Sequence, residues 1–145
     1  MKSKTNVVII DSNFILLPFQ FKVDYFLEIR QMLEGKVKFI IFQQILNELN
    51  SKKGKQQKAT KFNRFLQSGL LYLERNNKKY QIEILEEIKN EYETTDDFLL
   101  KKAIVLNRKG NNVYLATNDS ELRKKAHTQH INTIFLRQKK YLTID

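Results

Sequence analysis

The sequence predicts an α/β fold, with a mostly parallel central sheet and helices on both of its faces. Short runs of β-branched and aromatic residues alternate along the chain with longer segments whose apolar residues repeat at helical spacing. The chain has 145 residues, 41% of them hydrophobic, which predicts one domain over residues 1–145 with a substantial core. Because strands that alternate with helices form βαβ units, a parallel sheet is expected.

The first half of the chain predicts two strands and three helices. Val7–Ile10 is a compact β-branched run, typical of a strand buried on both faces. Asp24–Leu33 has apolar residues at helical spacing and is followed by Gly35, a residue type that commonly ends helices. The other elements of this half are a strand at Val37–Phe42, a short helix at Gln43–Asn50, a polar and basic loop at Ser51–Lys58, and a helix at Ala59–Glu74.

The second half continues the alternation. Tyr80–Leu85 is a candidate third strand, and Thr95 is expected to cap a helix at Asp96–Arg108. The remaining elements are a turn at Gly110–Asn112, a strand at Val113–Ala116, a helix at Asp119–His127, a strand at Thr133–Leu136, and an edge strand at Lys140–Thr143.

Composition excludes several classes of function. The chain has no cysteine, so disulfides, zinc fingers, iron–sulfur clusters and thiol catalysis are excluded. Lys2 and Lys4 precede an apolar run, but Asp11 and Asn13 interrupt it too early for a secretory signal. No segment approaches the length of a membrane span, so no membrane association is expected. The absence of cysteine and of a secretory signal fits a cytoplasmic location.

The chain is strongly basic, with 26 Lys and Arg against 16 Asp and Glu and a net charge of +10. This balance indicates a polyanionic partner, most often nucleic acid, although a solvated basic surface gives the same composition. The candidate phosphate-binding residues lie in two runs: Lys52, Lys53, Lys55, Lys58, Lys61 and Arg64, then Arg123, Lys124 and Lys125.

Acidic residues recur where predicted strands end. Asp11 follows the first strand directly, and Asp119 comes just after the strand at 113–116. Glu48 lies near the buried face of the helix after the second strand, while Asp96 and Asp97 begin the helix after the third. Ligands of open α/β sheets bind beyond the carboxyl ends of the strands, so these acids are expected at one edge. Taken singly, each acid also fits a cap, a turn or a solvated helix position.

Several carboxylates at one edge would repel one another and raise each other's pKa, a conflict that a divalent cation relieves. Ligand sets made only of oxygen suit Mg²⁺ or Mn²⁺ rather than zinc. In a basic protein this combination indicates hydrolysis of phosphodiester bonds, with the metal activating water and binding the phosphate.

Four segments together resemble the PIN-domain nucleases: VVIIDSNFI, IIFQQILNEL, TTDDFLLKKA and VYLATNDSEL. Their order and spacing span nearly the whole chain. The segment FLRQKKYL near the end resembles single-domain archaeal PIN proteins related to ribosomal-RNA-processing nucleases more than the VapC toxins. The resemblance implies a PIN-like three-layer sandwich and a metal-dependent RNA endonuclease directed at single strands.

The resemblance also implies an acidic site of Asp11, Glu48, Asp96, Asp97 and Asp119. It gives the metal ligands as Asp11, Glu48, Asp119 and one or both of Asp96 and Asp97, with Asp97 preferred. Asn13 and Asn118 match positions that support such a site. An aspartate found one turn further along in some members is not evident here, where Glu121 is the nearby acid.

Other classes remain open at this point. The same fold could serve a non-catalytic RNA-binding or ribosome-assembly factor, or a VapC-like toxin with an antitoxin partner. A homodimer is a further expectation, with Phe19, Phe21 and Tyr25 either at the contact or in the core. Receiver domains and haloacid-dehalogenase-like phosphatases require acidic patterns that the first strand lacks, and His127 and His130 are interpreted as surface or cap residues.

Overall fold

The computed structural model describes residues 4–55 and 60–145, and it describes their side chains except those of residues 19, 53–55 and 60–62. The elements follow in the order β1 (Asn6–Ile10), α1 (Ser12–Ile15), α2 (Leu17–Gln20), α3 (Tyr25–Met32), β2 (Val37–Phe42), α4 (Gln43–Lys55), α5 (Thr60–Asn76), β3 (Gln81–Leu85), α6 (Thr95–Arg108), β4 (Asn112–Ala116), α7 (Ser120–Thr128), β5 (Asn132–Arg137) and β6 (Tyr141–Ile144).

The strands form one sheet in the order β3-β2-β1-β4-β5-β6. Every pairing is parallel except that of β5 with β6, which is antiparallel. β1 lies in the middle and is buried along its whole length, as its unbroken apolar run predicts. Its register places Ile10 opposite Ala116 of β4, so the carboxyl ends of these two strands lie side by side.

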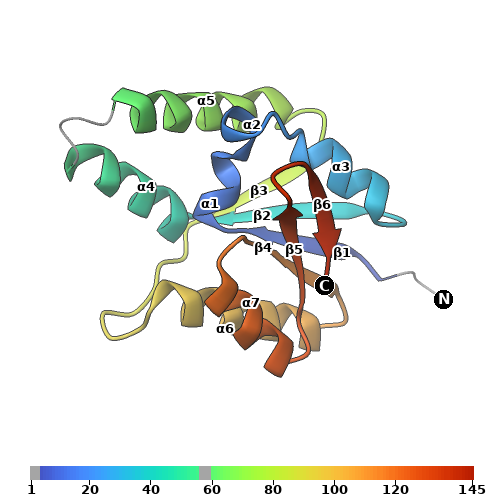
Figure 1. The fold of residues 1–145 in the computed structure, drawn as a ribbon. Helices are drawn as coiled ribbons and strands as arrows, with labels where there is room; N and C mark the ends of the chain where they lie inside the picture. Colours follow the sequence, from blue (N-terminus) through green and yellow to red (C-terminus); the bar gives the residue numbers. More distant parts are fainter. Residues whose placement is uncertain (1–3, 56–59) are drawn as a thin grey trace.

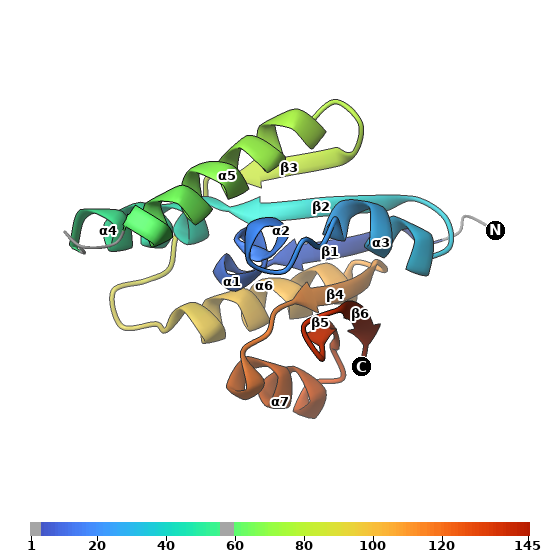
Figure 2. The ribbon, with the colours of Figure 1, turned by 45° about the horizontal axis from the view of Figure 1, so that its top comes forward.

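Helices cover both faces of the sheet and complete the three layers that the sequence predicts. Figure 1 shows α2, α3 and α5 on one side of the strands, with α6 and α7 on the other. α6 turns Phe98, Leu99 and Ala103 inward, so its apolar stripe seals the sheet on that side. Figure 2 shows α4 extending past the end of β2, beyond the carboxyl edge of the sheet.

Aromatic rings fill the end of the core near the starts of β2 and β3. Phe26 in α3 meets Phe39 of β2 edge to face at 4.7 Å and stacks on Tyr72 of α5 at 5.2 Å. Phe26 also stacks on Tyr80, the residue before β3, with ring centroids 5.5 Å apart. Offset and edge-to-face pairs of this kind add to the stability gained by burial, and they fix the position of Tyr80.

Helices α1 and α5 pack unusually closely at a glycine. A Cβ atom built on Gly69 of α5 would lie 2.5 Å from the backbone carbonyl oxygen of Ile15 in α1. Carbon and oxygen atoms do not approach this closely without displacement, so the contact requires glycine at this position. The backbone of the short helix α1, which begins beside Asp11, therefore lies directly against α5 at this glycine.

Several local predictions are wrong. The helix predicted to end at Asn50 continues to Lys55, because the Lys-rich segment read as a loop from Ser51 also favours helix. The helix predicted from Asp96 starts one residue earlier, and its cap is Thr94, whose hydroxyl accepts a hydrogen bond from the Asp97 amide at 3.1 Å. Helices α1 and α2 were not predicted at all.

The aromatic residues proposed for a dimer contact are largely internal. Tyr25 is completely buried, and Phe21 is partly buried against the core, whereas the side chain of Phe19 is outside the described set. Tyr25 therefore offers no surface to a second copy of the chain, and Phe21 offers only the part of its side chain that is exposed. Within residues 4–55 and 60–145, no helix combines the length and apolar composition needed to span a membrane.

Candidate active site

A cavity of about 290 Å³ lies beyond the carboxyl ends of β1 and β4, between α4 and the start of α6. Its walls combine residues from every segment that the sequence analysis singled out for acids. Lining it are Asp11, Ser12, Asn13, Leu16, Glu48, Leu49, Lys52, Thr95, Asp96 and Asp119. Four of the five predicted acids therefore face the same space, and Asp97 is the exception.

Asp11 is the most buried acid of the cavity, with 7% of its surface exposed. Its Oδ1 accepts a hydrogen bond from the Ser12 amide at 2.8 Å, and its Oδ2 accepts one from the Thr117 hydroxyl at 2.7 Å. Burial raises the pKa of Asp11; these two hydrogen bonds oppose the shift, and the charges of Asp119 and Glu48 add to it. A bound cation would offset the cost of this buried charge.

Glu48 is oriented by a network that reaches beyond its own helix. Its Oε1 accepts hydrogen bonds from the hydroxyl of Thr95 and from Nε2 of Gln44, the latter at 3.1 Å. Gln44 in turn accepts a hydrogen bond through Oε1 from the amide of Lys89, also at 3.1 Å. The network ties α4 to the start of α6 and to the segment before it, so Glu48 faces the cavity in a defined orientation.

The adjacent acids Asp96 and Asp97 have different surroundings. Asp96 lines the cavity, and partial burial raises its pKa, as do the charges of Asp119 and Asp11. Asp97 is exposed and accepts a hydrogen bond from the ammonium group of Lys125 in α7, at 3.3 Å. The structure thus places Asp96 with the other acids, whereas Asp97 links α6 to α7 outside the cavity.

Asp119 caps helix α7 and also shares a hydrogen-bond partner with Asp11. Its Oδ1 caps α7 by accepting hydrogen bonds from the amides of Glu121 and Leu122, at 2.9 and 3.2 Å. Its own amide donates to the Thr117 hydroxyl at 3.1 Å, the same hydroxyl that donates to Asp11. Capping leaves Oδ2 without a hydrogen bond in the parts of the chain that the structure describes. Glu121 is exposed and does not line the cavity.

The two asparagines join the loops that follow β1 and β4. Asn13 Oδ1 accepts a hydrogen bond from the Asn118 amide at 3.0 Å, while its Nδ2 contacts Asp11 Oδ2 at 3.4 Å. Asn118 Oδ1 accepts a hydrogen bond from the Leu136 amide in β5 at 2.8 Å. Thr117 and Thr95, which sequence reasoning did not identify as partners of the acids, complete these contacts. In the sequence their only signal is a hydroxyl residue one or two positions before an expected acid.

The predicted basic residues are dispersed. Lys52 lines the cavity and Arg64 is exposed on α5. Arg123 lies over the ring of Phe135 at 3.5 Å and 3.6 Å from a carboxylate oxygen of Asp145. Lys124 is exposed nearby on α7. The remaining predicted residues of the first run, whose side chains or positions lie outside the described set, are Lys53, Lys55, Lys58 and Lys61.

The donor chemistry of the cavity fits Mg²⁺ or Mn²⁺, because its charged ligands are all carboxylates. Among the residues that the structure describes, no group of three acidic or histidine side chains is close enough to hold one ion. Mg²⁺ commonly takes only one or two carboxylates and retains several waters, so such a group is not required.

A mostly parallel sheet with an acidic cavity beyond its central strands defines an α/β protein whose site lies at the carboxyl edge of the sheet. A family model described as a PIN like domain matches residues 8–139. The chain belongs to this family, which confirms the resemblance found in the sequence.

Individual relatives extend over nearly the full chain. Ribonuclease VapC4 of Methanocaldococcus jannaschii is 28% identical over 141 residues, which cover 94% of this chain and 95% of that protein. The solved structure of the PIN domain endonuclease Utp24 matches with a TM-score of 0.65 and 23% identity, over 96% of this chain and 90% of that one. A domain of a functionally unknown protein from M. jannaschii matches with a TM-score of 0.63 and 18% identity, over 93% and 92%. The two solved structures confirm the three-layer fold.

Proposed function

We propose that this protein is a ribonuclease that hydrolyses phosphodiester bonds of single-stranded RNA at the acidic cavity, with Mg²⁺ or Mn²⁺ as cofactor. The observation that supports this most directly is the meeting of Asp11, Glu48, Asp96 and Asp119 from four separate segments around one space. Membership of the PIN-like domain family and the ribonuclease name of the 28% identical relative point the same way.

In this proposal Asp11 and Asp119 hold the metal, with Glu48 and Asp96 as further ligands to the ion or its waters. When bound, the metal lowers the pKa of a water molecule and stabilises charge on the phosphate. Asp96 takes the role that the sequence suggested for Asp97, because Asp96 lines the cavity. Lys52 at the wall of the same cavity would pair with a phosphate oxygen of the substrate.

The chain's own residues also prepare the cavity for a cation. Hydrogen bonds from Ser12 and Thr117 fix both carboxylate oxygens of Asp11, and those from Thr95 and Gln44 fix Glu48. Ligands held in place before binding lose less conformational freedom when the ion arrives. The asparagines Asn13 and Asn118 support this arrangement by joining the two loops of the cavity.

The test is a cleavage assay with labelled unstructured and hairpin RNAs in Mg²⁺, Mn²⁺ or EDTA. Asp11→Asn and Asp119→Asn are expected to lower the rate by about a hundredfold or more, the scale on which loss of a catalytic group acts. Asp97→Asn is the matched control, since it removes the same charge outside the cavity and should leave most of the activity. Equal cleavage by Asp11→Asn and the unaltered protein, or full activity in EDTA, would contradict the proposal.

The cellular role is a separate proposal. We expect a cytoplasmic enzyme acting in ribosomal RNA processing, and a toxin that pairs with an antitoxin is the second candidate because the curated relative has a VapC name. Growth arrest on expression of the unaltered protein but not of Asp11→Asn, relieved by a small neighbouring gene product, would favour the toxin. RNA binding without cleavage under every metal condition would instead favour a non-catalytic binding or assembly factor.

A further inference from the structure

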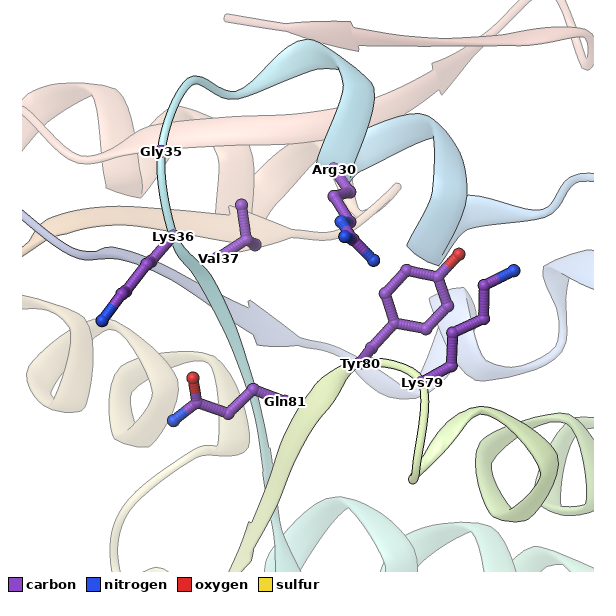
Figure 3. Close-up of a pocket in the computed structure, with 7 residues that line it drawn as sticks. All are labelled: Arg30, Gly35, Lys36, Val37, Lys79, Tyr80 and Gln81. Atoms are coloured by element: carbon purple, nitrogen blue, oxygen red, sulfur yellow. The ribbon is translucent and has the colours of Figure 1, made fainter.

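A second cavity, of about 490 Å³, lies at the opposite edge of the sheet, where β2 and β3 begin. Figure 3 shows the side chains around it, from the end of α3, the turn before β2 and the turn before β3. Arg30, Lys36 and Lys79 contribute charge, and Val37, Tyr80 and Gln81 contribute much of the remaining wall. It is separate from the acidic cavity, because the two share no lining residue.

The cations of this basic cavity have no acidic partner in the part of the chain that the structure describes. No carboxylate is among its lining residues. None of its three cations lies within 4.0 Å of a carboxylate oxygen in residues 4–55 and 60–145, whereas Lys38, Lys101, Lys102 and Lys125 are all in ion pairs. Three exposed cations thus line one cavity that has no acid among its lining residues, which makes this part of the surface electropositive.

Tyr80 adds a second, independent observation. It is only 5% exposed, yet its hydroxyl has no hydrogen-bond partner in the described structure. The Arg30 guanidinium lies 5.4 Å from the centre of its ring and the Lys79 ammonium 5.5 Å. In Figure 3 the hydroxyl is seen between the ends of these two side chains. A buried hydroxyl without a partner is costly, and an acceptor oxygen of an anion that displaced the neighbouring long side chains would provide one.

We propose that the basic cavity binds backbone phosphates of RNA, as a contact site remote from the acidic cavity. A chain of phosphates fits better than a single small anion because the cations are spread out: Lys36 extends to the other side of the cavity from Arg30 and Lys79 (Figure 3). β2 has six residues, so the two edges are roughly 20 Å apart along the strand. The choice of RNA rests on the proposed function, whereas the anion site itself does not.

The test measures RNA binding in EDTA, so that an absence of nuclease activity cannot affect the result. A fluorescein-labelled oligouridylate is titrated with the unaltered protein, with the double variant Lys36→Gln/Lys79→Gln, and with the control Lys109→Gln/Lys140→Gln. The control removes the same charge from exposed lysines that line neither cavity. For two lost phosphate contacts, the slope of log affinity against log salt should become shallower by about 1.4 in the double variant alone.

Two further measurements complete the test. Tyr80→Phe should weaken oligouridylate binding while leaving the thermal melting temperature at or above that of the unaltered protein, because it removes an unpaired hydroxyl. Slopes that are equal in the double variant and the control would overturn the proposal. Full displacement of the oligouridylate by millimolar inorganic phosphate would also overturn it, in favour of a single-anion site.

Discussion

The hydroxyl of Thr95, the first residue of α6, donates a hydrogen bond to the carboxylate of Glu48 in α4. The two residues are 47 positions apart in the sequence, and the bond joins α4, which extends past the end of β2, to α6, which covers one face of the sheet (Figures 1 and 2). Gln44 donates to the same carboxylate oxygen. Glu48 is thus positioned by its neighbours rather than by its own helix alone, and several predictions concern this kind of positioning.

The first prediction concerns Thr95 itself. Thr95→Val keeps the shape but removes the donor, so Glu48 should lose its orientation and the cleavage rate should fall about tenfold, the equivalent of one hydrogen bond to a charged group. KM should change little, because the lost contact positions a cavity residue and does not bind substrate. Thr95→Ser should restore the rate in the same steady-state assay. Equal rates for the Val and Ser variants would show that the hydroxyl has no such role.

The second prediction concerns the packing of α1 on α5. Alanine normally stabilises an exposed helix relative to glycine by about 1 kcal/mol, but at Gly69 the added Cβ would lie 2.5 Å from the Ile15 carbonyl oxygen. Gly69→Ala should therefore lower the free energy of unfolding by roughly 1–3 kcal/mol, the usual cost of overpacking. Denaturant titration measures this, with Ser68→Ala as the neighbouring control. Stabilisation by Gly69→Ala would contradict the close approach.

The third prediction is a dependence of stability on pH. The pKa of Asp96 is raised by partial burial and by the charges of Asp119 and Asp11. Between its ordinary value of 3.8 and its raised value, the folded protein keeps a proton that the unfolded chain has lost. Stability therefore falls as the pH rises through this window and stays lower above it.

Asp96→Asn removes this effect and should make the protein more stable at pH 7, by at most about 1 kcal/mol because Asp96 is partly exposed. The difference should disappear below pH 3.8, where the carboxyl is neutral in both states. Urea titrations at several pH values provide the measurement. A variant that is equally stable at neutral pH would mean that the repulsion among these acids is too weak to matter.

The fourth prediction concerns metal binding. Mn²⁺ at about a hundred times its dissociation constant should stabilise the unaltered protein by about 2.7 kcal/mol, seen as a higher melting temperature that EDTA reverses. Asp119→Asn should abolish this shift without loss of the helix cap, since Asn caps helices as well as Asp does. Asp97→Asn should keep the shift. If all three proteins respond alike, the ion binds outside the acidic cavity.

The parts of the fold that could be predicted are the strands whose burial requires a run of apolar residues in the sequence. β1, β2 and β4 are apolar runs because both faces of a central parallel strand are covered, and the sequence shows them clearly. The meeting of Asp11 with Asp119 follows from the same rule, since neighbouring parallel strands end at one edge. The four-residue helices α1 and α2 are too short to show a period, and so they were missed.

Within the candidate site, contacts between distant segments could not be predicted. Asp96 and Asp97 are adjacent at a helix start, and only the orientation of α6 decides that the first faces the cavity and the second faces Lys125. Thr117 reaches Asp11 because β1 pairs with β4, which gives no local signal. Arg30, Lys36 and Lys79 share no pattern in the sequence, and the fold alone places them around one basic cavity.

The central place of β1 between β2 and β4 also bears on how the protein is made. Asp11 leaves the ribosome well before the hydroxyl that fixes it, because Thr117 comes 106 residues later, after β4. A growing polypeptide that stops short of this strand has an incomplete cavity wall and an open core. The acidic cavity can therefore be completed only after β4 has been translated, although its most buried acid is made long before.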